Sequence, residues 1–284
     1  MLKKHLVACA LVCAVVPSAA QAAKPSGGGG GGTTYVEPLP GSMASTGDSI
    51  TRGFNACGWY VDCAGESWST GTDTAVNSQY LRLKGVNRSF GSGYNDAKTG
   101  AKMTDLNGQV TTAVGQRPDY ITILMGANDA CTSSEATMTD VATFRSQVDA
   151  ALNTISANLP ATRIFVASIP DVYRLWYVGH TSSSAVSAWN GFSVCQSILA
   201  NPTSTAQADE DRRQRVRQRV VDFNAQLQQA CAAHAHCLYD NNAVFSYPFV
   251  LSQVSGWDYF HPNKSGQAVL ASETWKVVHS AWGW

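Results

Sequence analysis

Short apolar runs alternate with amphipathic stretches through most of this 284-residue chain. The alternation predicts strands that alternate with helices, and therefore a parallel sheet covered by helices on both faces. The runs that we interpret as buried strands are 42–46, 120–125, 163–168 and 237–240. The stretches with helical spacing are 139–159, 208–235 and about 265–279, with a further helix starting near Met103. In such sheets, functional sites gather at the carboxyl ends of the strands.

The N-terminus is typical of an export signal. Lys3 and Lys4 precede an apolar stretch, Leu6–Val16, and then a small-x-small cleavage site, Ala20-Gln21-Ala22. We predict a signal peptide over 1–22, a glycine-rich flexible leader over 23–40 and one domain over 41–284, in a protein secreted to the periplasm or the medium. A lipoprotein box at Leu6–Cys9 is the alternative, but it leaves too short an apolar region before it. The apolar stretch is also too short to span a bilayer.

Charge and composition exclude two classes of partner. Lysine and arginine number 20, and aspartate and glutamate also number 20, so no net charge favours nucleic acid or an anionic membrane. We therefore expect no nucleic-acid partner and no stable membrane insertion. Five arginines between Arg212 and Arg219 are interpreted as the solvated face of a surface helix, balanced by Asp209, Glu210 and Asp211.

Six cysteines remain once the predicted signal peptide is removed. An even number in an exported chain predicts disulfides, and six cysteines allow about 15 pairings. Proximity in the sequence favours Cys57–Cys63 and Cys231–Cys237, which leaves Cys131–Cys195. No spacing resembles a metal-binding cysteine motif, so no metal site is expected.

The segment Gly47-Asp48-Ser49 follows the first predicted strand. Alone it is typical of a turn, but Ser49 is also a candidate nucleophile if a base can take its proton. His261 is the candidate base, because Asp258 three residues earlier can orient its ring on a tight loop. His180, in a predicted loop, is a weaker alternative. The histidines that we interpret as structural or surface residues are His234, His236 and His279.

Acyl transfer needs hydrogen-bond donors for a developing oxyanion. Asn128 follows the predicted strand 120–125, so its side chain is expected at a carboxyl end of the sheet. Gly100 lies just before a predicted helix and offers a backbone N–H, and Ser49 offers its own. Motifs of other enzyme classes are absent: Thr51 stands where a GxSxG nucleophile elbow needs glycine, and no SxxK, HExxH or P-loop sequence occurs.

Taken together, these residues resemble the GDSL, or SGNH, hydrolase family. The resemblance rests on four ordered blocks, which are Gly47-Asp48-Ser49-Ile50, Gly100, Gly126-x-Asn128-Asp129 and Asp258-x-x-His261. It is nearest to the secreted bacterial esterase and lipase branch with three sequential disulfides. It implies a three-layer α/β/α sandwich with a flavodoxin-like parallel sheet, and ester hydrolysis without a metal or another cofactor.

The resemblance also implies a role for each block. Ser49 would be the nucleophile, His261 the base and Asp258 its orienter, while Gly100 and Asn128 would join Ser49 in the oxyanion hole. Some secreted relatives use a backbone carbonyl instead of the acid, but here Asp258 stands at the expected place. We therefore predict a full Ser-His-Asp triad in a monomer that acts on a small-molecule or lipid ester.

The substrate is less well defined. The segment 172–195 carries several aromatic residues and is either a wall of an acyl pocket or a packed excursion that covers the core. Trp176, Tyr177 and Trp257 are the candidate substrate-binding residues. The alternatives to a carboxylesterase or lipase are an acyltransferase or a carbohydrate O-acetyl esterase of the same fold. A non-catalytic glycan-binding module is a further alternative, against which the intact set of catalytic residues argues.

Overall fold

The computed structural model describes residues 38–284. The predicted signal peptide over 1–22 and most of the predicted leader over 23–40 lie outside the described residues. The described chain contains five strands, which are β1 (Met43–Gly47), β2 (Gly93–Asn95), β3 (Tyr120–Leu124), β4 (Arg163–Val166) and β5 (Cys237–Tyr239).

These strands form one parallel sheet in the order β2-β1-β3-β4-β5. This is the flavodoxin-like order, in which the direction of winding reverses between β1 and β3. Every residue of β1 and β3 is buried, which explains why these strands read as continuous apolar or small-residue runs. The predicted fold class is therefore confirmed.

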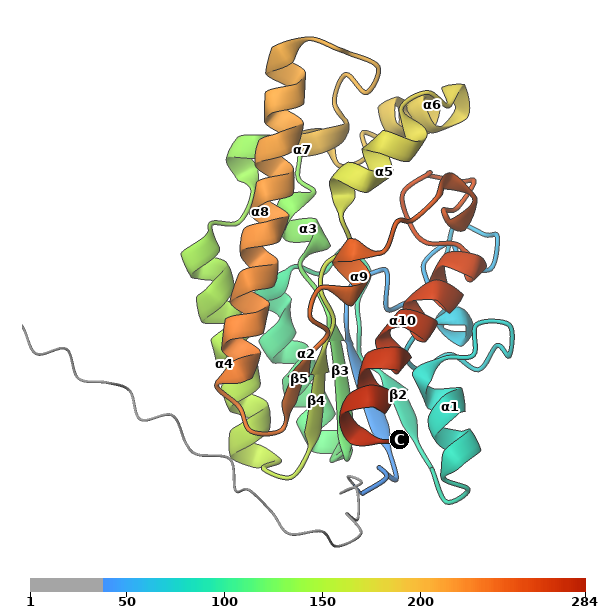
Figure 1. The fold of residues 1–284 in the computed structure, drawn as a ribbon, viewed down its shortest axis with the longest axis vertical. Coiled ribbons are helices and arrows are strands. Elements are labelled where there is room, and N and C mark those ends of the chain that lie inside the picture. Colours follow the sequence, from blue (N-terminus) through green and yellow to red (C-terminus); the bar gives the residue numbers. More distant parts are fainter. Residues whose placement is uncertain (1–37) are drawn as a thin grey trace, which may run out of the picture. The chain divides into compact units, whose positions relative to one another are not determined.

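Helices cover both faces of the sheet. Figure 1 shows α4 (Val141–Asn158) and α8 (Gln207–Ala232) on one side and α1 (Gln79–Val86) and α10 (Lys264–Trp282) on the other. Helix α2 (Met103–Gln116) contacts both β1 and α4. The remaining helical segments are short, namely α3 (Ala127–Ala130), α5 (Val172–Gly179), α6 (Ser183–Gly191), α7 (Gln196–Leu199), α9 (Ala243–Ser246) and the 3-10 turns η1 (Ala64–Glu66), η2 (Glu135–Thr137) and η3 (Leu251–Gln253).

Aromatic contacts help to pack the helices on both sides of the sheet. On one side, Phe144 of α4 stacks on Phe223 of α8 with ring centroids 3.9 Å apart. On the other, Tyr120 of β3 meets Trp282 of α10 edge to face at 5.8 Å. All three of Phe144, Phe223 and Tyr120 are fully buried, so aromatic rings contribute to the core on both sides of the sheet.

Two parts of the fold differ from the expectation. Strand β2 was not predicted, because it has only three residues and lies at an exposed edge where no apolar run is needed. The segment 172–195 is not a loop, because α5 and α6 occupy most of it. Asp171 begins α5 by accepting hydrogen bonds from the backbone N–H groups of Tyr173 and Arg174, which is a common N-cap.

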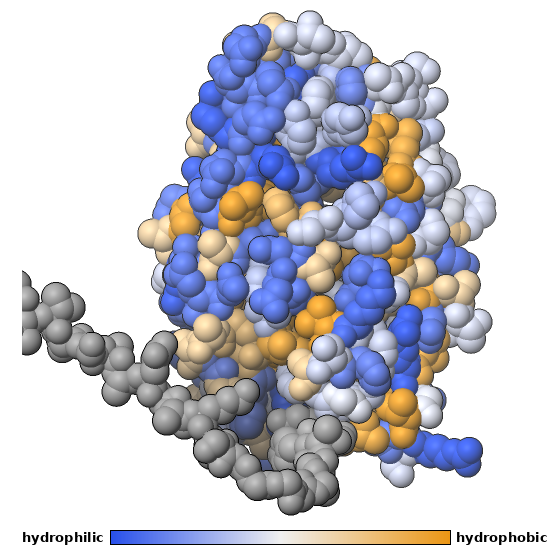
Figure 2. Space-filling view, viewed as in Figure 1, coloured by the Kyte–Doolittle hydropathy of each residue, from blue (hydrophilic) through white to orange (hydrophobic). Residues whose placement is uncertain are grey.

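Most arginines of α8 lie on its solvated face, as the sequence predicted. Arg212, Arg215, Arg217 and Arg219 are at least partly exposed, and Figure 2 shows mainly hydrophilic residues where α8 lies in Figure 1. Arg213 is the exception, because its side chain is only 1% exposed. The guanidinium of this buried residue lies 4.2 Å from the ring centre of Trp176 and bonds to Glu210.

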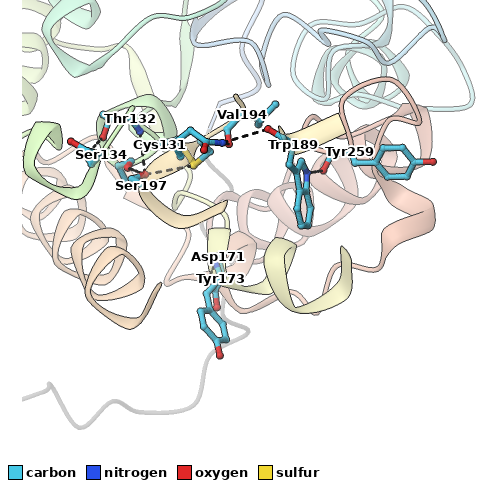
Figure 3. The surroundings of a disulfide bond; sticks show 12 residues. Cys131, Thr132, Ser134, Asp171, Tyr173, Trp189, Val194, Ser197 and Tyr259 are labelled. Carbon is cyan, nitrogen blue, oxygen red and sulfur yellow. Dashed lines mark hydrogen bonds between the residues drawn. A yellow bond between two sulfur atoms is a disulfide. The ribbon is translucent and has the colours of Figure 1, made fainter. Parts of the chain in front are cut away.

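All three predicted disulfides are present. Cys57–Cys63 and Cys231–Cys237 each close a sequence separation of 6 residues, and Cys131–Cys195 closes one of 64. Figure 3 shows the surroundings of the bond at Cys131, where Thr132 and Ser197 exchange hydrogen bonds of 2.9 and 3.2 Å. In the described part of the chain, no helix has both the length and the apolar character needed to cross a membrane.

Candidate active site

The first component of the site is the sharp turn after β1. Gly47, the last residue of β1, has φ of +151°, and a Cβ there would lie 2.4 Å from the carbonyl oxygen of Leu124. Only glycine fits this close approach. Gln109 of α2 fixes the same residue, because its side chain accepts from the N–H of Gly47 at 2.7 Å and donates to its carbonyl at 2.9 Å. Ser49 follows at the carboxyl end of β1.

The second component is the loop before α10. Asp258 and His261 lie on one turn. The carboxylate oxygen Oδ1 of Asp258 accepts hydrogen bonds from the backbone N–H groups of Phe260 and His261, at 3.0 and 3.1 Å. Asn263 caps α10 by accepting from the N–H of Gly266 at 3.1 Å. Gln267, one turn into α10, donates to the carbonyl of Ile50 at 2.8 Å. Helix α10 therefore holds the histidine loop and the serine turn together.

The two components meet in a chain of three side chains. Ser49 Oγ lies 2.8 Å from His261 Nε2, and His261 Nδ1 lies 2.5 Å from Asp258 Oδ2. Asp258 is 3% exposed and Ser49 is 4% exposed. The structure thus brings together the three residues that the sequence proposed as a triad, although 212 residues separate the serine from the histidine.

The carboxyl group of Asp258 is held in its ionised form. Burial raises its pKa, but the hydrogen bond from His261, the charge of that ring and two backbone N–H groups outweigh the burial and lower the pKa below the ordinary value. An ionised carboxylate can orient the imidazole and stabilise the imidazolium that forms when His261 takes a proton.

A second buried carboxyl group lies beside the serine. Asp48 is fully buried, and Oδ1 accepts the N–H of Ile50 at 2.9 Å. Burial raises the pKa of Asp48 to about 7, although the bond from Ile50 and the charge of His261 act in the opposite direction. The second oxygen, Oδ2, has no hydrogen-bond partner among the described residues.

Three donors are available for an oxyanion. Among the described residues, the backbone N–H groups of Ser49 and Gly100 make no hydrogen bond. Gly100 has φ of +81°, which glycine adopts without strain. The side-chain amide of Asn128 donates one hydrogen to the carbonyl of Ala101, at 2.9 Å, so Asn128 lies against the residue that follows Gly100. Its second N–H stays available, as an oxyanion hole requires.

An apolar cavity opens beside His261. Its volume is about 70 Å³, room for several water molecules or a short hydrocarbon group. One wall comes from the segment that starts α5, and the other from the segment around η3 and the histidine loop. The residues that line it are Ile50, Ala127, Pro170, Asp171, Val172, Leu175, Val178, Phe249, Gln253, Val254, Phe260, His261 and Pro262.

The three predicted substrate-binding residues lie outside this lining. Trp176 is buried against Arg213 and donates to the carbonyl of Pro202 at 2.8 Å. Tyr177 is 57% exposed. Trp257 is 47% exposed and donates to the carbonyl of Gly58 at 2.8 Å. On α5, the residues that line the cavity are instead the aliphatic Val172, Leu175 and Val178.

Three other histidines have side-chain contacts away from Ser49. His180 ends α5, where its ring stacks on Trp176 and bonds to the carbonyl of Tyr177. His234 bonds to Ser156 at 2.8 Å, and His279 bonds to the carbonyl of Trp284. The alternative assignment of His180 as the base therefore has no geometric support, since Ser49 bonds to His261.

Asn55 is a residue of the candidate site that no motif in the sequence indicates. Its side-chain amide donates to Asp258 Oδ2 at 2.7 Å, across 203 residues of sequence. No local pattern in the sequence could have revealed this contact, because it depends on how two distant loops meet. The residue does carry one signal, since asparagine is common in the left-handed conformation that it adopts, with φ of 66°.

Comparison with solved structures supports the fold. An extracellular lipase from Streptomyces rimosus has a TM-score of 0.50 at 19% identity and covers 84% of this chain and 99% of its own. Phospholipase A1 from Streptomyces albidoflavus scores 0.52 at 17% identity, with 85% and 99% covered. A family 3 carbohydrate esterase from Clostridium thermocellum scores 0.51 at 12% identity, with 85% and 96% covered. At these identities the likeness shows the fold alone.

Comparison of sequences shows the family. No curated protein matches this chain. The model of the GDSL-like lipase/acylhydrolase family matches residues 45–274, which is most of the chain and includes the serine turn, the Asn128 segment and the histidine loop. Ester hydrolysis is the chemistry of this family. The chain therefore belongs to the GDSL-like lipase/acylhydrolase family.

Proposed function

We propose that this protein is an exported serine carboxylester hydrolase that acts through a covalent acyl-enzyme. The observation that carries the proposal is the continuous set of short contacts from Ser49 Oγ to His261 and from His261 to Asp258. A serine hydroxyl is a weak nucleophile alone, and a bonded histidine whose ring is oriented by a carboxylate makes it reactive.

The first half of the reaction forms the acyl-enzyme. His261 Nε2 takes the proton of Ser49 as Oγ attacks the ester carbonyl, and Asp258 stabilises the resulting imidazolium. The tetrahedral oxyanion rests on the backbone N–H groups of Ser49 and Gly100 and on the free N–H of Asn128. The C–O bond to the alcohol then breaks, and His261 returns its proton to the leaving alcohol.

The second half releases the acid. A water molecule gives its proton to His261 Nε2 and attacks the acyl carbonyl, and collapse of the second tetrahedral intermediate returns the proton to Ser49 Oγ. The same three donors hold the oxyanion in both halves. An alcohol in place of the water would give acyl transfer by the same steps, so the identity of the acceptor decides between hydrolase and transferase.

The cavity beside His261 supports an apolar group in the substrate. Its lining is almost entirely aliphatic and aromatic apart from His261, Asp171 and Gln253. Burial of each methylene contributes about 0.8 kcal/mol, so an ester with a short apolar chain gains affinity there. The three disulfides support export, because such bonds persist in oxidising compartments.

Covalent labelling tests the nucleophile directly. A fluorophosphonate should label Ser49 of the wild type, and Ser49→Ala should lose both labelling and hydrolysis of p-nitrophenyl butyrate, with turnover reduced by about 10⁴- to 10⁶-fold. A Ser45→Ala variant is the control, because Ser45 lies buried within β1 rather than at its end. Near-normal hydrolysis by Ser49→Ala would refute the mechanism.

A series of esters tests the substrate class. We expect activity on p-nitrophenyl esters to rise from acetyl to a chain of several carbons and then to fall, because the cavity has finite length. Activity confined to acetyl esters, together with deacetylation of acetylated oligosaccharides, would favour a carbohydrate O-acetyl esterase. Product analysis with added glycerol separates hydrolysis from acyl transfer.

A further inference from the structure

The loop that follows the serine turn contains Asn55, which contacts the carboxylate of the triad. Asn55 Nδ2 donates to Asp258 Oδ2 at 2.7 Å, and both side chains are buried, at 1% and 3% exposed. We propose that Asn55 is a positioning residue that keeps the carboxylate of Asp258 aimed at His261. This inference rests on the proposed function, because it assigns a role within that triad.

The hydrogen bonds of Asp258 show what Asn55 adds. Oδ1 is held by two backbone N–H groups of its own turn. Oδ2 accepts from His261 Nδ1 and from Asn55. Asn55 is therefore the donor outside the histidine loop that fixes the oxygen facing the imidazole. Without it, that oxygen would have the imidazole as its remaining partner, and the carboxylate could pivot with the ring.

The local fold makes Asn55 a rigid support. Its backbone N–H donates to the carbonyl of Val61 at 3.0 Å, and its carbonyl accepts from Gly58 at 3.2 Å. The disulfide Cys57–Cys63 closes the adjoining segment, which contains both of these backbone partners, Gly58 and Val61. The left-handed φ of 66° suits asparagine better than most residues. The chain thus combines a fixed backbone with a side chain that has few rotatable bonds.

A second contact joins the same two loops. Trp257, next to Asp258, donates from its indole N–H to the carbonyl of Gly58 at 2.8 Å. The loop that contains Asn55 therefore bonds both to the catalytic carboxylate and to the residue beside it. This places Trp257 in the support of the triad, whereas the sequence made it a candidate substrate-binding residue.

The chemistry favours an amide at this position. As His261 becomes an imidazolium, Asp258 must stay deprotonated and in place. An N–H donor to the charged form of a carboxyl group stabilises that form, and an amide neither gives up nor takes a proton near neutral pH. A hydrogen bond to a charged group contributes about 1.5–3 kcal/mol, which corresponds to about 10- to 100-fold in rate if it is fully expressed in the transition state.

Two variants distinguish the role of the Asn55 side-chain amide from that of the backbone conformation. Asn55→Gly removes the donor and keeps the left-handed conformation, which glycine adopts freely. Asn55→Asp keeps the shape and replaces the donor with a carboxyl group. The matched control is Asn77→Gly, because Asn77 is also left-handed, with φ of 49°, but is exposed and outside the site. Each full-length, disulfide-bonded variant is assayed for kcat and KM with p-nitrophenyl butyrate and for thermal unfolding.

We expect Asn55→Gly to lower kcat by about 10- to 100-fold with KM unchanged, and Asn77→Gly to match the wild type. The pH profile gives a signature that a structural role would not move. Beside Asp258, the introduced carboxyl group of Asn55→Asp has a raised pKa and donates only while protonated. The kcat of Asn55→Asp relative to Asn55→Gly should therefore be highest at low pH and fall as pH rises.

The outcomes separate this inference from the function on which it rests. If fluorophosphonate labels the wild type and folded Asn55→Gly has the kcat of the wild type, Asn55 has no role in positioning, and the inference fails alone. A kcat ratio of the two variants that does not change with pH also contradicts it. If the wild type is neither labelled nor active on any ester, the proposed function fails first and this inference falls with it.

Discussion

In the proposed oxyanion hole, Asn128 is the donor that substitution can remove, because the other two donors are backbone N–H groups. Asn128→Ala should lower kcat by about 10²- to 10³-fold, a rise of about 2.7–4 kcal/mol in the barrier, with little change in KM. Thermal unfolding is the control, since the same amide also bonds to Ala101. A raised KM at unchanged kcat would instead assign Asn128 to ground-state binding.

Asp48 makes stability depend on pH. Burial raises its pKa to about 7 from the model-peptide value of 3.8. Between these two pH values the folded state holds a proton that the unfolded state has lost, so the free energy of unfolding falls as pH rises, by about 4 kcal/mol in total. Above about pH 7 this decrease in the free energy of unfolding is constant, because Asp48 is then ionised in both the folded and the unfolded state.

Asp48→Asn tests this dependence. The amide oxygen can still accept the N–H of Ile50, which now bonds to Oδ1 at 2.9 Å, but the side chain cannot ionise. The stability of the variant relative to the wild type should therefore rise between about pH 4 and pH 7 and then level off. Urea titrations across this range measure the difference. A constant difference at every pH would show that Asp48 ionises as readily in the folded as in the unfolded state.

At the level of single residues, the sequence identified some parts of the site and missed others for a physical reason. Ser49, Asn128 and His261 stand in short motifs, where the chemistry fixes the residue types and the local turn fixes their spacing. Asn55 touches Asp258 across 203 positions, and no spacing within the chain encodes that approach.

At the level of elements, burial determines what the sequence reveals. Strands β1 and β3 are buried throughout, so their side chains are apolar or small and the runs are visible. Strand β2 is an exposed edge of three residues and leaves no such run. Helix α5 has buried Trp176 and exposed Tyr177 side by side, and the sequence alone could not show which of its faces borders the cavity.

Helix α5 gives a prediction about substrate selectivity. Leu175 lines the cavity, and Leu175→Trp would fill part of it. Excluding two methylenes of a substrate chain costs about 1.6 kcal/mol, or about tenfold in affinity. We therefore expect Leu175→Trp to lower kcat/KM for the longest well-hydrolysed ester about tenfold relative to kcat/KM for the acetyl ester. Two series of esters are measured, one that varies the acyl part and one that varies the alcohol part. The series in which Leu175→Trp causes this fall identifies whether the acyl or the alcohol part of the ester lies in the cavity.

The matched control lies on the same helix. Tyr177 is 57% exposed and does not line the cavity, so Tyr177→Trp makes a comparable change two residues away. It should leave the preference for chain length unchanged. If Tyr177→Trp shifts that preference and Leu175→Trp does not, the original assignment of Tyr177 as a substrate-binding residue is correct and the cavity holds no part of the ester.

At the level of the whole molecule, the site exists only because the sheet brings distant segments to one edge. The serine turn follows β1, Asn128 lies on α3 just after β3, and the histidine loop precedes α10. Parallel strands place their carboxyl ends together, and Gln267 of α10 bonds to the residue after the serine. The alternation of strands and helices therefore predicted where the site lies, whereas its exact contacts depend on the completed fold.

The disulfides should stabilise the whole molecule, and a longer closed loop should give the larger effect, although the effect grows only with the logarithm of loop length. For the separation of 64 residues between Cys131 and Cys195, loss of loop-closure entropy in the unfolded chain corresponds to about 4 kcal/mol. For the separation of 6 between Cys231 and Cys237, it is about 2 kcal/mol. Replacing both cysteines of each pair by serine should lower the free energy of unfolding by these amounts in urea.

Activity well below the unfolding transition should survive removal of Cys131–Cys195. Cys131 follows α3, which carries Asn128, but Ser197 also holds this segment, since its hydroxyl donates to the carbonyl of Ala130 at 2.7 Å and its N–H to that of Thr132 at 2.9 Å. These bonds keep Asn128 in place while the chain is folded. Measuring kcat at low temperature beside the urea titration separates the two roles. A loss of kcat as large as that of Asn128→Ala, in a variant that is still folded, would show that the disulfide itself positions the oxyanion hole.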